Sequence, residues 1–111
     1  SVSTSVSTSI SKLTKLAKQS RSLLTIKYQL KHHTGFIYSV AFHDHLHLLA
    51  SSSFDATVIL YDLTTSPPNI KHRLEDHNGW IMGIAFHPSV SLIASGSYDN
   101  TIMLYNLNKI L

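Results

Sequence analysis

Histidine, serine and aspartate, the residue types of a hydrolytic triad, occur together twice in this 111-residue sequence. His33 and Asp55 recur as His77 and Asp99, both offset by 44 residues, with serines between the His and the Asp of each set. A nucleophilic serine needs an exposed position on a strained turn, a base and an oxyanion hole. No Gly-x-Ser-x-Gly string occurs, and the nearest string, Ser-Gly-Ser at 95–97, lies within an expected strand. Since a duplicated catalytic triad is hardly expected, we predict a structural role for both sets and no enzymatic activity.

A histidine-rich segment at residues 43–47, His-Asp-His-Leu-His, is the candidate for a metal site. Alternating imidazoles on an extended segment would share one face, as Zn²⁺ binding needs. The segment falls in an expected turn, however, and its counterpart at 87–91 keeps one of the three histidines. We therefore interpret it as a polar, solvated turn and predict no metal site. The four isolated glycines form no phosphate-binding loop, and we expect no cofactor.

The elements that position these side chains are short runs of β-branched and aromatic residues, separated by turn formers and beginning at residue 23. None of these runs shows helical periodicity. The expected strands are 23–30, 37–42, 48–53 and 58–63, followed by 70–74, 81–86, 92–97 and 102–107.

The second group of runs repeats the first. Residues 26–63 align with residues 70–107 without a gap, and 18 of the 38 aligned positions are identical. Units of four antiparallel strands at a period of about 40–45 residues are typical of propeller blades. The sequence thus predicts an all-β protein with two four-stranded antiparallel β-propeller blades, a partial propeller. The expected units are 23–66 and 67–111, after an N-terminal extension at 1–22.

Two stretches, HHTGFIYSVAF…LLASSSFDATVILYDL and DHNGWIMGIAF…LIASGSYDNTIMLYNL, resemble consecutive units of the WD-repeat (Trp-Asp repeat) β-propeller family. The resemblance covers roughly residues 23–111. It rests on the His before the first strand, the Ala-Phe that closes that strand, the Leu/Ile-Ala-Ser-x-Ser run and the x-Asp-x-Thr turn. Two pairs of positions depart from the family. Its Gly-His is His32-His33 and Asp76-His77 here, and its Trp-Asp is Tyr61-Asp62 and Tyr105-Asn106.

The resemblance implies a hydrogen-bonded network in each unit that joins the turn Asp to the His, a strand Ser and the aromatic residue of the third strand. A carboxylate in a tight turn can accept bonds from nearby backbone N–H groups. The implied members are His33, Ser51 or Ser53, Asp55 and Tyr61 in one unit, and His77, Ser95 or Ser97, Asp99 and Tyr105 in the other. Which serine belongs to each network stays open. Loss of one member of such a network typically costs ~1–3 kcal/mol.

The resemblance also implies function through surface recognition, since propellers of this family usually bind peptides or other domains on one face. The implied partner-binding residues are Phe36, Tyr38 and Phe54, with Trp80, Met82 and Tyr98. Aromatic residues and Met are typical of interface hot spots. The alternative is that these side chains fill the core between blades. Our leading prediction is a non-catalytic protein–protein interaction scaffold whose partners are proteins or peptides, with no small-molecule substrate.

The N-terminal extension differs in composition from the rest of the chain. Residues 1–11 alternate Ser and Thr with small apolar residues, and we expect them to be flexible because they bury too little to offset the entropy of ordering. Residues 10–21 place Ile and Leu at helical spacing among lysines, which favours a short basic amphipathic helix. The net charge is +3 and the first acidic residue is Asp44. An alternative function is therefore that of a membrane- or nucleic-acid-associated accessory protein acting through residues 12–31.

Two blades alone would leave flat apolar faces uncovered. A closed propeller takes about 4–8 blades, and repeats of this kind bury their apolar faces against neighbours. We therefore expect a longer propeller, self-association, or docking onto further blades. In the family an N-terminal strand completes the final blade, and here the run at 23–30 would join one copy to the next in the same way. The lack of cysteine fits a cytoplasmic or nuclear location.

Overall fold

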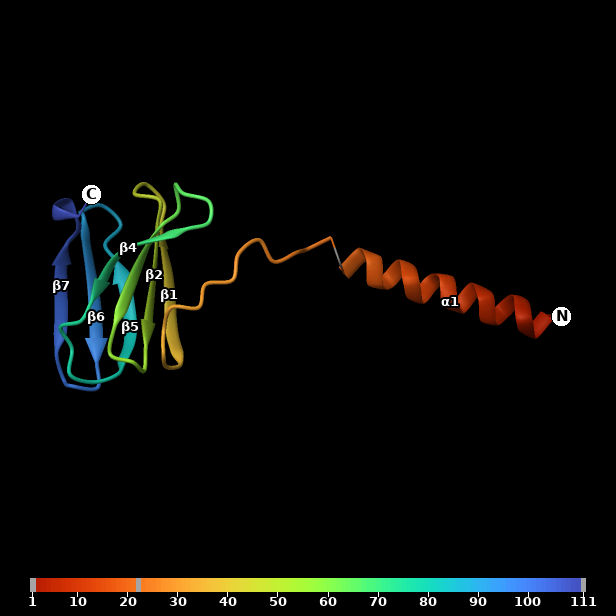
Figure 1. Ribbon diagram of the computed structural model, residues 1–111, viewed down its shortest axis with the longest axis horizontal. Helices are drawn as coiled ribbons and strands as arrows, with labels where there is room; N and C mark the ends of the chain where they lie inside the picture. The colour runs from red at the N-terminus through yellow and green to blue at the C-terminus, as the bar shows by residue number, and fades with distance from the viewer. Residues whose placement is uncertain (1, 22, 111) are drawn as a thin grey trace. The chain divides into compact units, whose positions relative to one another are not determined.

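The computed structural model describes residues 2–21 and 23–110, and the chain forms two units, Ser1–Leu30 and Lys31–Leu111. The N-terminal unit contains one helix, α1, at Val2–Arg21 (Figure 1). The expectation that residues 1–11 are flexible is therefore wrong from Val2 onward, because the helix expected at 10–21 begins eight residues earlier, at Val2. No glycine or proline occurs before Gly35, so nothing in the sequence interrupts the helix. No helix of the described residues is long and apolar enough to cross a membrane.

The strand expected at 23–30 is absent, because residues 25–32 carry no regular secondary structure. A strand is stable only when a neighbouring strand satisfies its backbone N–H and C=O groups. In the second repeat the equivalent strand pairs with the last strand of the repeat before it. The described residues ahead of the first repeat form α1, and 23–30 therefore has no such neighbour among the described strands.

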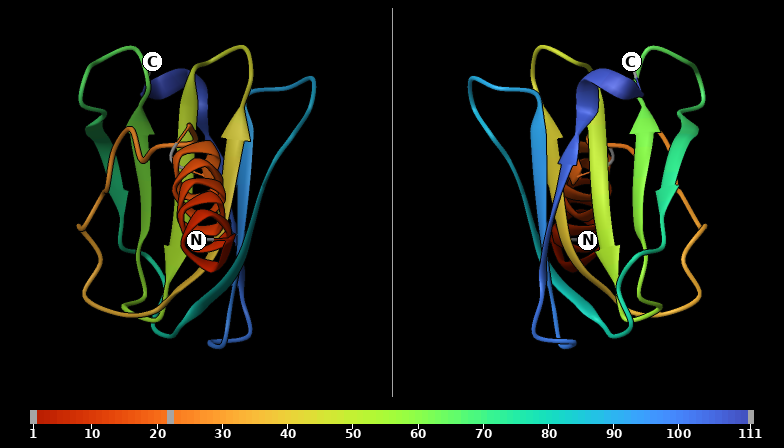
Figure 2. Two further views of the ribbon diagram at one scale, coloured as in Figure 1. Left: turned by 90° about the vertical axis from the view of Figure 1, so that its right-hand side faces the viewer. Right: turned by 90° about the vertical axis from the view of Figure 1, so that its left-hand side faces the viewer.

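The C-terminal unit consists of two antiparallel sheets (Figure 2). The first sheet has four strands in the order β1-β2-β3-β4, but its fourth strand comes from the second expected unit and takes the place of the run at 23–30. The second sheet has three strands, β5-β6-β7, where four were expected. Each of these strands begins and ends within one residue of the expected bounds. The strands are β1 Ile37–His43, β2 Leu48–Ser53, β3 Val58–Asp62, β4 Asn69–Leu74, β5 Ile81–Phe86, β6 Leu92–Ser97 and β7 Ile102–Asn106, and a short 3₁₀ helix, η1, follows at Leu107–Lys109.

We call β1–β4 blade 1 and β5–β7 blade 2. Ala50, Val58 and Leu60 of blade 1 are completely buried. The register pairs Ala50 with Leu60, so their side chains lie on one face of the sheet. That face packs against Ile81 and Ile93 of blade 2, together with Leu107 of η1, and the six residues form the apolar core.

The turns that join the strands within each blade also repeat. Ala56 and Asn100, each directly after the turn aspartate, both have positive φ, at 68° and 70°. Only glycine and, less readily, asparagine and aspartate adopt this conformation at low cost. The β2–β3 and β6–β7 turns therefore have the same backbone shape, although alanine is poorly suited to it.

Candidate functional site

The turn aspartate of blade 1 is the centre of a polar network. One carboxylate oxygen of Asp55 accepts the Thr57 hydroxyl and N–H at 2.6 and 2.9 Å. The other oxygen accepts the Thr34 N–H at 3.0 Å and lies 2.9 Å from Nδ1 of His33. The opposite ring nitrogen, Nε2 of His33, lies 2.6 Å from the Ser51 hydroxyl. The network thus ties the segment before β1, the β2 strand and the β2–β3 turn together.

Blade 2 repeats this arrangement at the equivalent positions. Nδ1 of His77 lies 2.9 Å from Asp99, and its Nε2 lies 2.8 Å from the Ser95 hydroxyl. Asp99 also accepts the Asn78 N–H at 2.9 Å and the Thr101 N–H at 2.9 Å. The geometry is therefore a property of the repeat and not of one blade.

The structure separates the serines left open by the sequence. Ser51 and Ser95 lie against the histidines, whereas Ser53 and Ser97 accept the backbone N–H of the turn aspartate two residues later, both at 3.1 Å. Ser97 also donates to the Gly79 carbonyl at 3.0 Å. One serine of each repeat therefore holds the histidine and the other shapes the turn.

The two tyrosines contact the residue just ahead of each network histidine. The Tyr61 hydroxyl lies 3.1 Å from Nδ1 of His32, and the Tyr105 hydroxyl donates to Asp76 at 2.8 Å. Sequence reasoning had assigned no role to His32, Asp76, Thr57 or Thr101. The x-Asp-x-Thr motif contained the signal for the threonines, because a hydroxyl two residues after an Asp can donate to its carboxylate.

Four aromatic rings form a second feature, at the end of the blades where the polar networks lie. Phe36 precedes β1, Phe54 follows β2, Trp80 precedes β5 and Tyr98 follows β6. We call these four residues the aromatic row. Ring centroids are 6.1 Å apart for Phe36–Phe54, 4.5 Å for Phe54–Trp80 and 4.9 Å for Trp80–Tyr98, the last two pairs being stacked.

The backbone holds the row in place. The Phe54 N–H donates to the Phe36 carbonyl at 2.8 Å, and the Tyr98 N–H donates to the Trp80 carbonyl at 2.9 Å. Gly35 permits this approach, because a Cβ there would lie 2.9 Å from the backbone nitrogen of Asp55. The same loop that supplies the network histidine therefore presents an aromatic ring at the surface.

The row is exposed, from 37% at Trp80 to 75% at Phe36. A cavity of about 490 Å³ opens at its blade 1 end and is lined by residues 33–36 and Phe54. The other two expected partner-binding residues, Tyr38 and Met82, are also exposed. They lie two residues further along the chain, and among the described residues no ring contact joins them to the row. The structure thus brings four of the six expected residues together.

The family described as "WD domain, G-beta repeat" matches residues 24–62 and 68–106, which is most of the chain. The chain belongs to the WD40 repeat family. Its fold is similar to that in the crystal structure of a computationally designed protein, Ika4, with a TM-score of 0.65 at 18% sequence identity. The match covers 79% of this chain and 51% of Ika4, so the chain spans about half the length of that protein. None of the curated proteins compared with the chain matches it.

Both WD40 repeats shift the pKa values of their polar groups. Burial by itself raises the pKa of Asp55, but hydrogen bonds from Thr57, Thr34 and His33 outweigh burial and lower this pKa to about 2. The Thr101 hydroxyl holds the pKa of Asp99 well below its usual range. Burial, together with the carboxylate of Asp76, raises the pKa of Tyr105 to about 12. The aspartates are therefore anionic acceptors and Tyr105 a neutral donor across the physiological pH range.

In each WD40 repeat the Asp, His and Ser lie in the order of a hydrolase triad, with the carboxylate on Nδ1 and the hydroxyl on Nε2. The serines, however, are only 4% and 1% exposed at Ser51 and Ser95, inside β2 and β6. A hydroxyl buried in a strand cannot meet the carbonyl of a substrate, which a nucleophile must do. The arrangement therefore supports the blade, in keeping with WD40 repeats as generally non-catalytic scaffolds.

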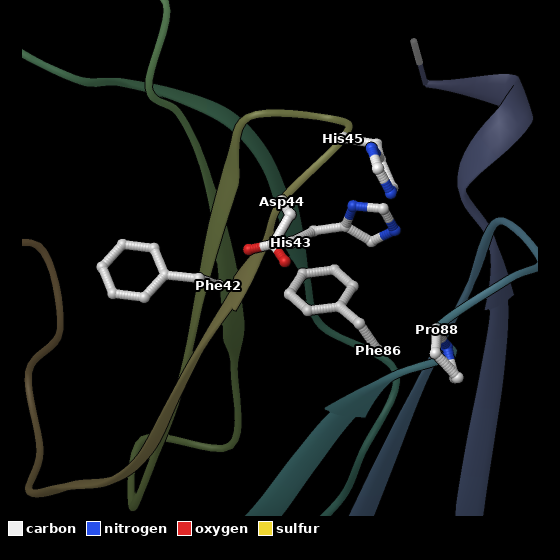
Figure 3. A pocket seen from close by; sticks show the side chains of 6 residues that line it. All are labelled: Phe42, His43, Asp44, His45, Phe86 and Pro88. Carbon is white, nitrogen blue, oxygen red and sulfur yellow. The ribbon is translucent and has the colours of Figure 1, made fainter.

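The histidine-rich segment lies at the opposite end of blade 1 and comprises the last residue of β1, His43, and the turn between β1 and β2. His43 and His45 border a cavity of about 250 Å³, with Phe86 packed edge-on against His43 (Figure 3). Nδ1 of His43 accepts the Leu46 N–H at 3.2 Å, so this nitrogen is already engaged. Within the described residues no group of three or more His, Cys, Asp or Glu side chains is arranged to hold a metal ion.

Proposed function

We infer that this chain is a WD40 scaffold that binds a peptide or an exposed loop of another protein across the aromatic row. The observation that carries this conclusion is the continuous row of four exposed rings contributed by both repeats, in which Phe36 meets Phe54 edge-on and the other two contacts are stacked. Contiguous exposed aromatic side chains mark interaction surfaces, because they bury large apolar areas at a low cost in side-chain entropy.

The polar networks support this surface by fixing the loops that carry it. Thr34 and Gly35 lie between the network histidine and Phe36, and Asp55 directly follows Phe54. A surface held by a hydrogen-bonded scaffold loses little freedom on binding, and this pre-organisation favours affinity. The alternative is that the aromatic side chains only fill the core between the blades. It explains why Phe54 stacks on Trp80, but not why Phe36 and Tyr98 are 75% and 67% exposed.

A displayed library of random peptides, selected on the full chain, tests the proposal. Trp80 is the only tryptophan, so its fluorescence reports peptides that bind at the row. We expect Tyr98→Ala to weaken the selected peptides about tenfold or more, as for an interface hot spot. Val90→Ala is the matched control, because Val90 is exposed in the loop at the other end of blade 2. Peptides that leave Trp80 fluorescence unchanged and bind Tyr98→Ala with full affinity would contradict the proposal.

A second candidate function uses the basic helix. In α1 the lysines at 12, 15 and 18 accompany Ile10, Leu13 and Leu16, whose side chains are all more than half exposed. Such a helix is suited to an anionic membrane surface or to nucleic acid. Deletion of residues 1–22 should abolish binding to anionic vesicles or RNA and leave peptide binding at the row intact. Equal vesicle and RNA binding with and without these residues would exclude this function.

A further inference from the structure

Each blade leaves one apolar face exposed, on opposite sides of the pair. On blade 1 the exposed side chains are Ile37, Val40 and Phe42, which we call the leading face. Val40 and Phe42 pair with Ser51 and Leu49, and so lie on the opposite side of the sheet from Ala50 and Leu60. Figure 3 shows Phe42 pointing away from Phe86 of blade 2. The leading face is therefore the side of blade 1 that blade 2 does not cover.

The corresponding surface of blade 2 comprises Ala85, Ala94, Ile102 and Leu104, which we call the trailing face. Ile102 and Leu104 are 74% and 67% exposed. Two hollows, of about 240 and 290 Å³, lie on this face, and Ala85 and Ala94 line both of them. The trailing face is thus a surface of small residues between larger apolar ones.

The contact between the two blades shows what fits these faces. The offset of 44 relates the leading face to Ile81, Ile84 and Phe86. It relates the trailing-face residues Ala94, Ile102 and Leu104 to Ala50, Val58 and Leu60. These two equivalent sets pack against each other to form the core between the blades. The leading face of one molecule is therefore complementary to the trailing face of another, as the same kinds of residues already are within one chain.

A missing strand provides separate evidence for the same contact. β4 lies beside β3 in blade 1, whereas β7, the equivalent of β3, has β6 as its one neighbour among the described strands. Residues 25–30, Thr-Ile-Lys-Tyr-Gln-Leu, align with β4, Asn-Ile-Lys-His-Arg-Leu, and match it at three of six positions. The chain therefore contains a second copy of the fourth-strand sequence that is not in a strand, and an edge that lacks its fourth strand.

The order of elements along the chain would bring residues 25–30 of one copy next to the open β7 edge of another. β4 is the fourth strand of blade 1, and the chain then continues into blade 2. The residues of blade 2 equivalent to the leading face, Ile81, Ile84 and Phe86, pack on blade 1. By the same connection, residues 25–30 precede blade 1 and its leading face. A molecule whose trailing face covers that leading face would receive residues 25–30 beside its β7.

We propose that copies of this chain assemble head to tail, the leading face of one copy packing on the trailing face of the next while residues 25–30 of the first supply the fourth strand of that blade. The contact is heterologous, so it closes into a ring when the rotation between copies allows. Rings of about 4–8 blades correspond to about two to four copies. The proposal concerns the flat faces and does not depend on the aromatic row.

Mixing two blocked variants tests the direction of assembly. Phe42→Glu blocks the leading face and Leu104→Glu the trailing face, both at side chains exposed in a single copy, 70% and 67%. In sedimentation experiments on the full chain, the unmodified protein should form oligomers of about two to four copies with increasing concentration. Each variant alone should remain monomeric, because every junction would include a charged face. An equimolar mixture should form one heterodimer and nothing larger, since one intact junction remains.

Val90→Glu is the matched control, with an added charge at an exposed apolar residue outside both faces. It should assemble like the unmodified chain, and far-ultraviolet circular dichroism confirms that the variants stay folded. A monomer at all concentrations would overturn the proposal and leave the blades of another protein as the occupant of these faces. Continued self-association of either single variant would also overturn it, because such pairing would be of a face with itself.

Cross-linking tests the strand that passes between copies, since the chain has no cysteine of its own. In blade 1 Arg73 of β4 pairs with Ile59 of β3, and the equivalent pair is Gln29 with Met103. Oxidation of Gln29→Cys mixed with Met103→Cys should give a disulfide-linked dimer, whereas Gln29→Cys mixed with Ser89→Cys should not. A chain that carries both Gln29→Cys and Met103→Cys should not form this disulfide within one molecule. An intramolecular disulfide in that chain, or equal linkage of the control pair, would contradict strand exchange between copies.

Discussion

Equivalent apolar residues of the two WD40 repeats differ strongly in burial, even where the residue is identical. Leu60 and Leu104 are the same residue at the same place in the repeat, yet Leu60 is completely buried and Leu104 is 67% exposed. Val58 and Ile102 show the same contrast, at 0% and 74% exposed. The difference arises because blade 2 covers β3 of blade 1 and nothing in the described chain covers β7 of blade 2. Sequence therefore specifies the shape of each blade, while burial depends on which neighbour is present.

The polar networks show the opposite behaviour. The distance from the turn Asp to the His is 2.9 Å in both repeats, and the His–Ser distances differ by only 0.2 Å, 2.6 against 2.8 Å. All members of each network come from one repeat, so a missing neighbour does not disturb them. The networks are a local property and the apolar core is a property of the pair.

Truncation of the two equivalent leucines gives the largest expected difference between the repeats. Leu60→Ala leaves a cavity in the core and should lower the free energy of unfolding by about 2–5 kcal/mol. Leu104→Ala removes an exposed side chain and should change it by less than about 0.5 kcal/mol in the monomer. Urea unfolding followed by Trp80 fluorescence measures both, in a Phe42→Glu background that prevents assembly. Equal costs for the two substitutions would show that the faces are equally buried.

Removal of the network aspartates should destabilise both repeats to a similar degree. Asp55→Ala and Asp99→Ala each leave a histidine and several backbone N–H groups without their acceptor, at an expected cost of about 2–3 kcal/mol. The same urea titration measures the two values. Thr64→Ala is the control, because its partner Asp62 lies outside the networks. A large loss of unfolding free energy in one repeat and none in the other would show that the two networks do not stabilise their repeats equally, despite their equal geometry.

Acid should weaken both networks over a defined pH range. The pKa of Asp55 is about 2 in the folded chain and 3.8 for an unperturbed carboxyl, so the unfolded state binds protons first as pH falls. The stabilisation from this group is therefore complete above about pH 4 and is lost as the pH falls toward about 2. The free energy of unfolding, measured from pH 6 to 2, should therefore decrease between about pH 4 and about pH 2. The fall should be smaller in Asp55→Asn, and an unchanged pH profile in that variant would contradict the assignment.

The smallest expected effect concerns the residue after each turn aspartate. Asn100 tolerates its positive φ of 70°, whereas Ala56 at 68° does not share the side-chain hydrogen bonding that favours this conformation. Ala56→Asn should therefore raise the free energy of unfolding by about 0.5–1 kcal/mol, and Asn100→Ala should lower it by about as much. Opposite signs in thermal unfolding would support the comparison. A loss of stability in Ala56→Asn would show that the two turns are not equivalent.

The internal repeat made most of the fold predictable, because alternation and turn residues defined seven strands within one residue of their bounds. The resemblance to WD repeats implied the His, Ser and Asp residues of both networks, but not Thr57 and Thr101. The choice between Ser51 and Ser53 was not predictable, since both follow the same pattern and only the register of β2 against the histidine loop separates them. The ring stacking of Phe54 on Trp80 was equally hidden, because it joins the β2–β3 turn of blade 1 to the loop before β5 of blade 2.

The strand expected at 23–30 was the clearest error, and its cause is informative. Its sequence matches β4 at Ile26, Lys27 and Leu30, so local propensity favours a strand. A strand also needs an edge to pair with, and sequence pattern does not report whether that edge is present. In α1 the error is the opposite one: residues 1–11 were expected to be flexible because they bury too little to offset the entropy of ordering, yet they are helical from Val2, and the cost of Ser and Thr in a helix is modest.

Hydrogen exchange of the β7 backbone, followed as a function of protein concentration, tests the central claim most directly. The account predicts that the inner strand β3 is protected at every concentration, because β2 and β4 flank it. The outer amides of β7 should exchange fast in dilute solution and become protected, together with residues 25–30, as the concentration rises. Protection of β7 that equals that of β3 in the dilute monomer, or that never increases with concentration, would contradict it.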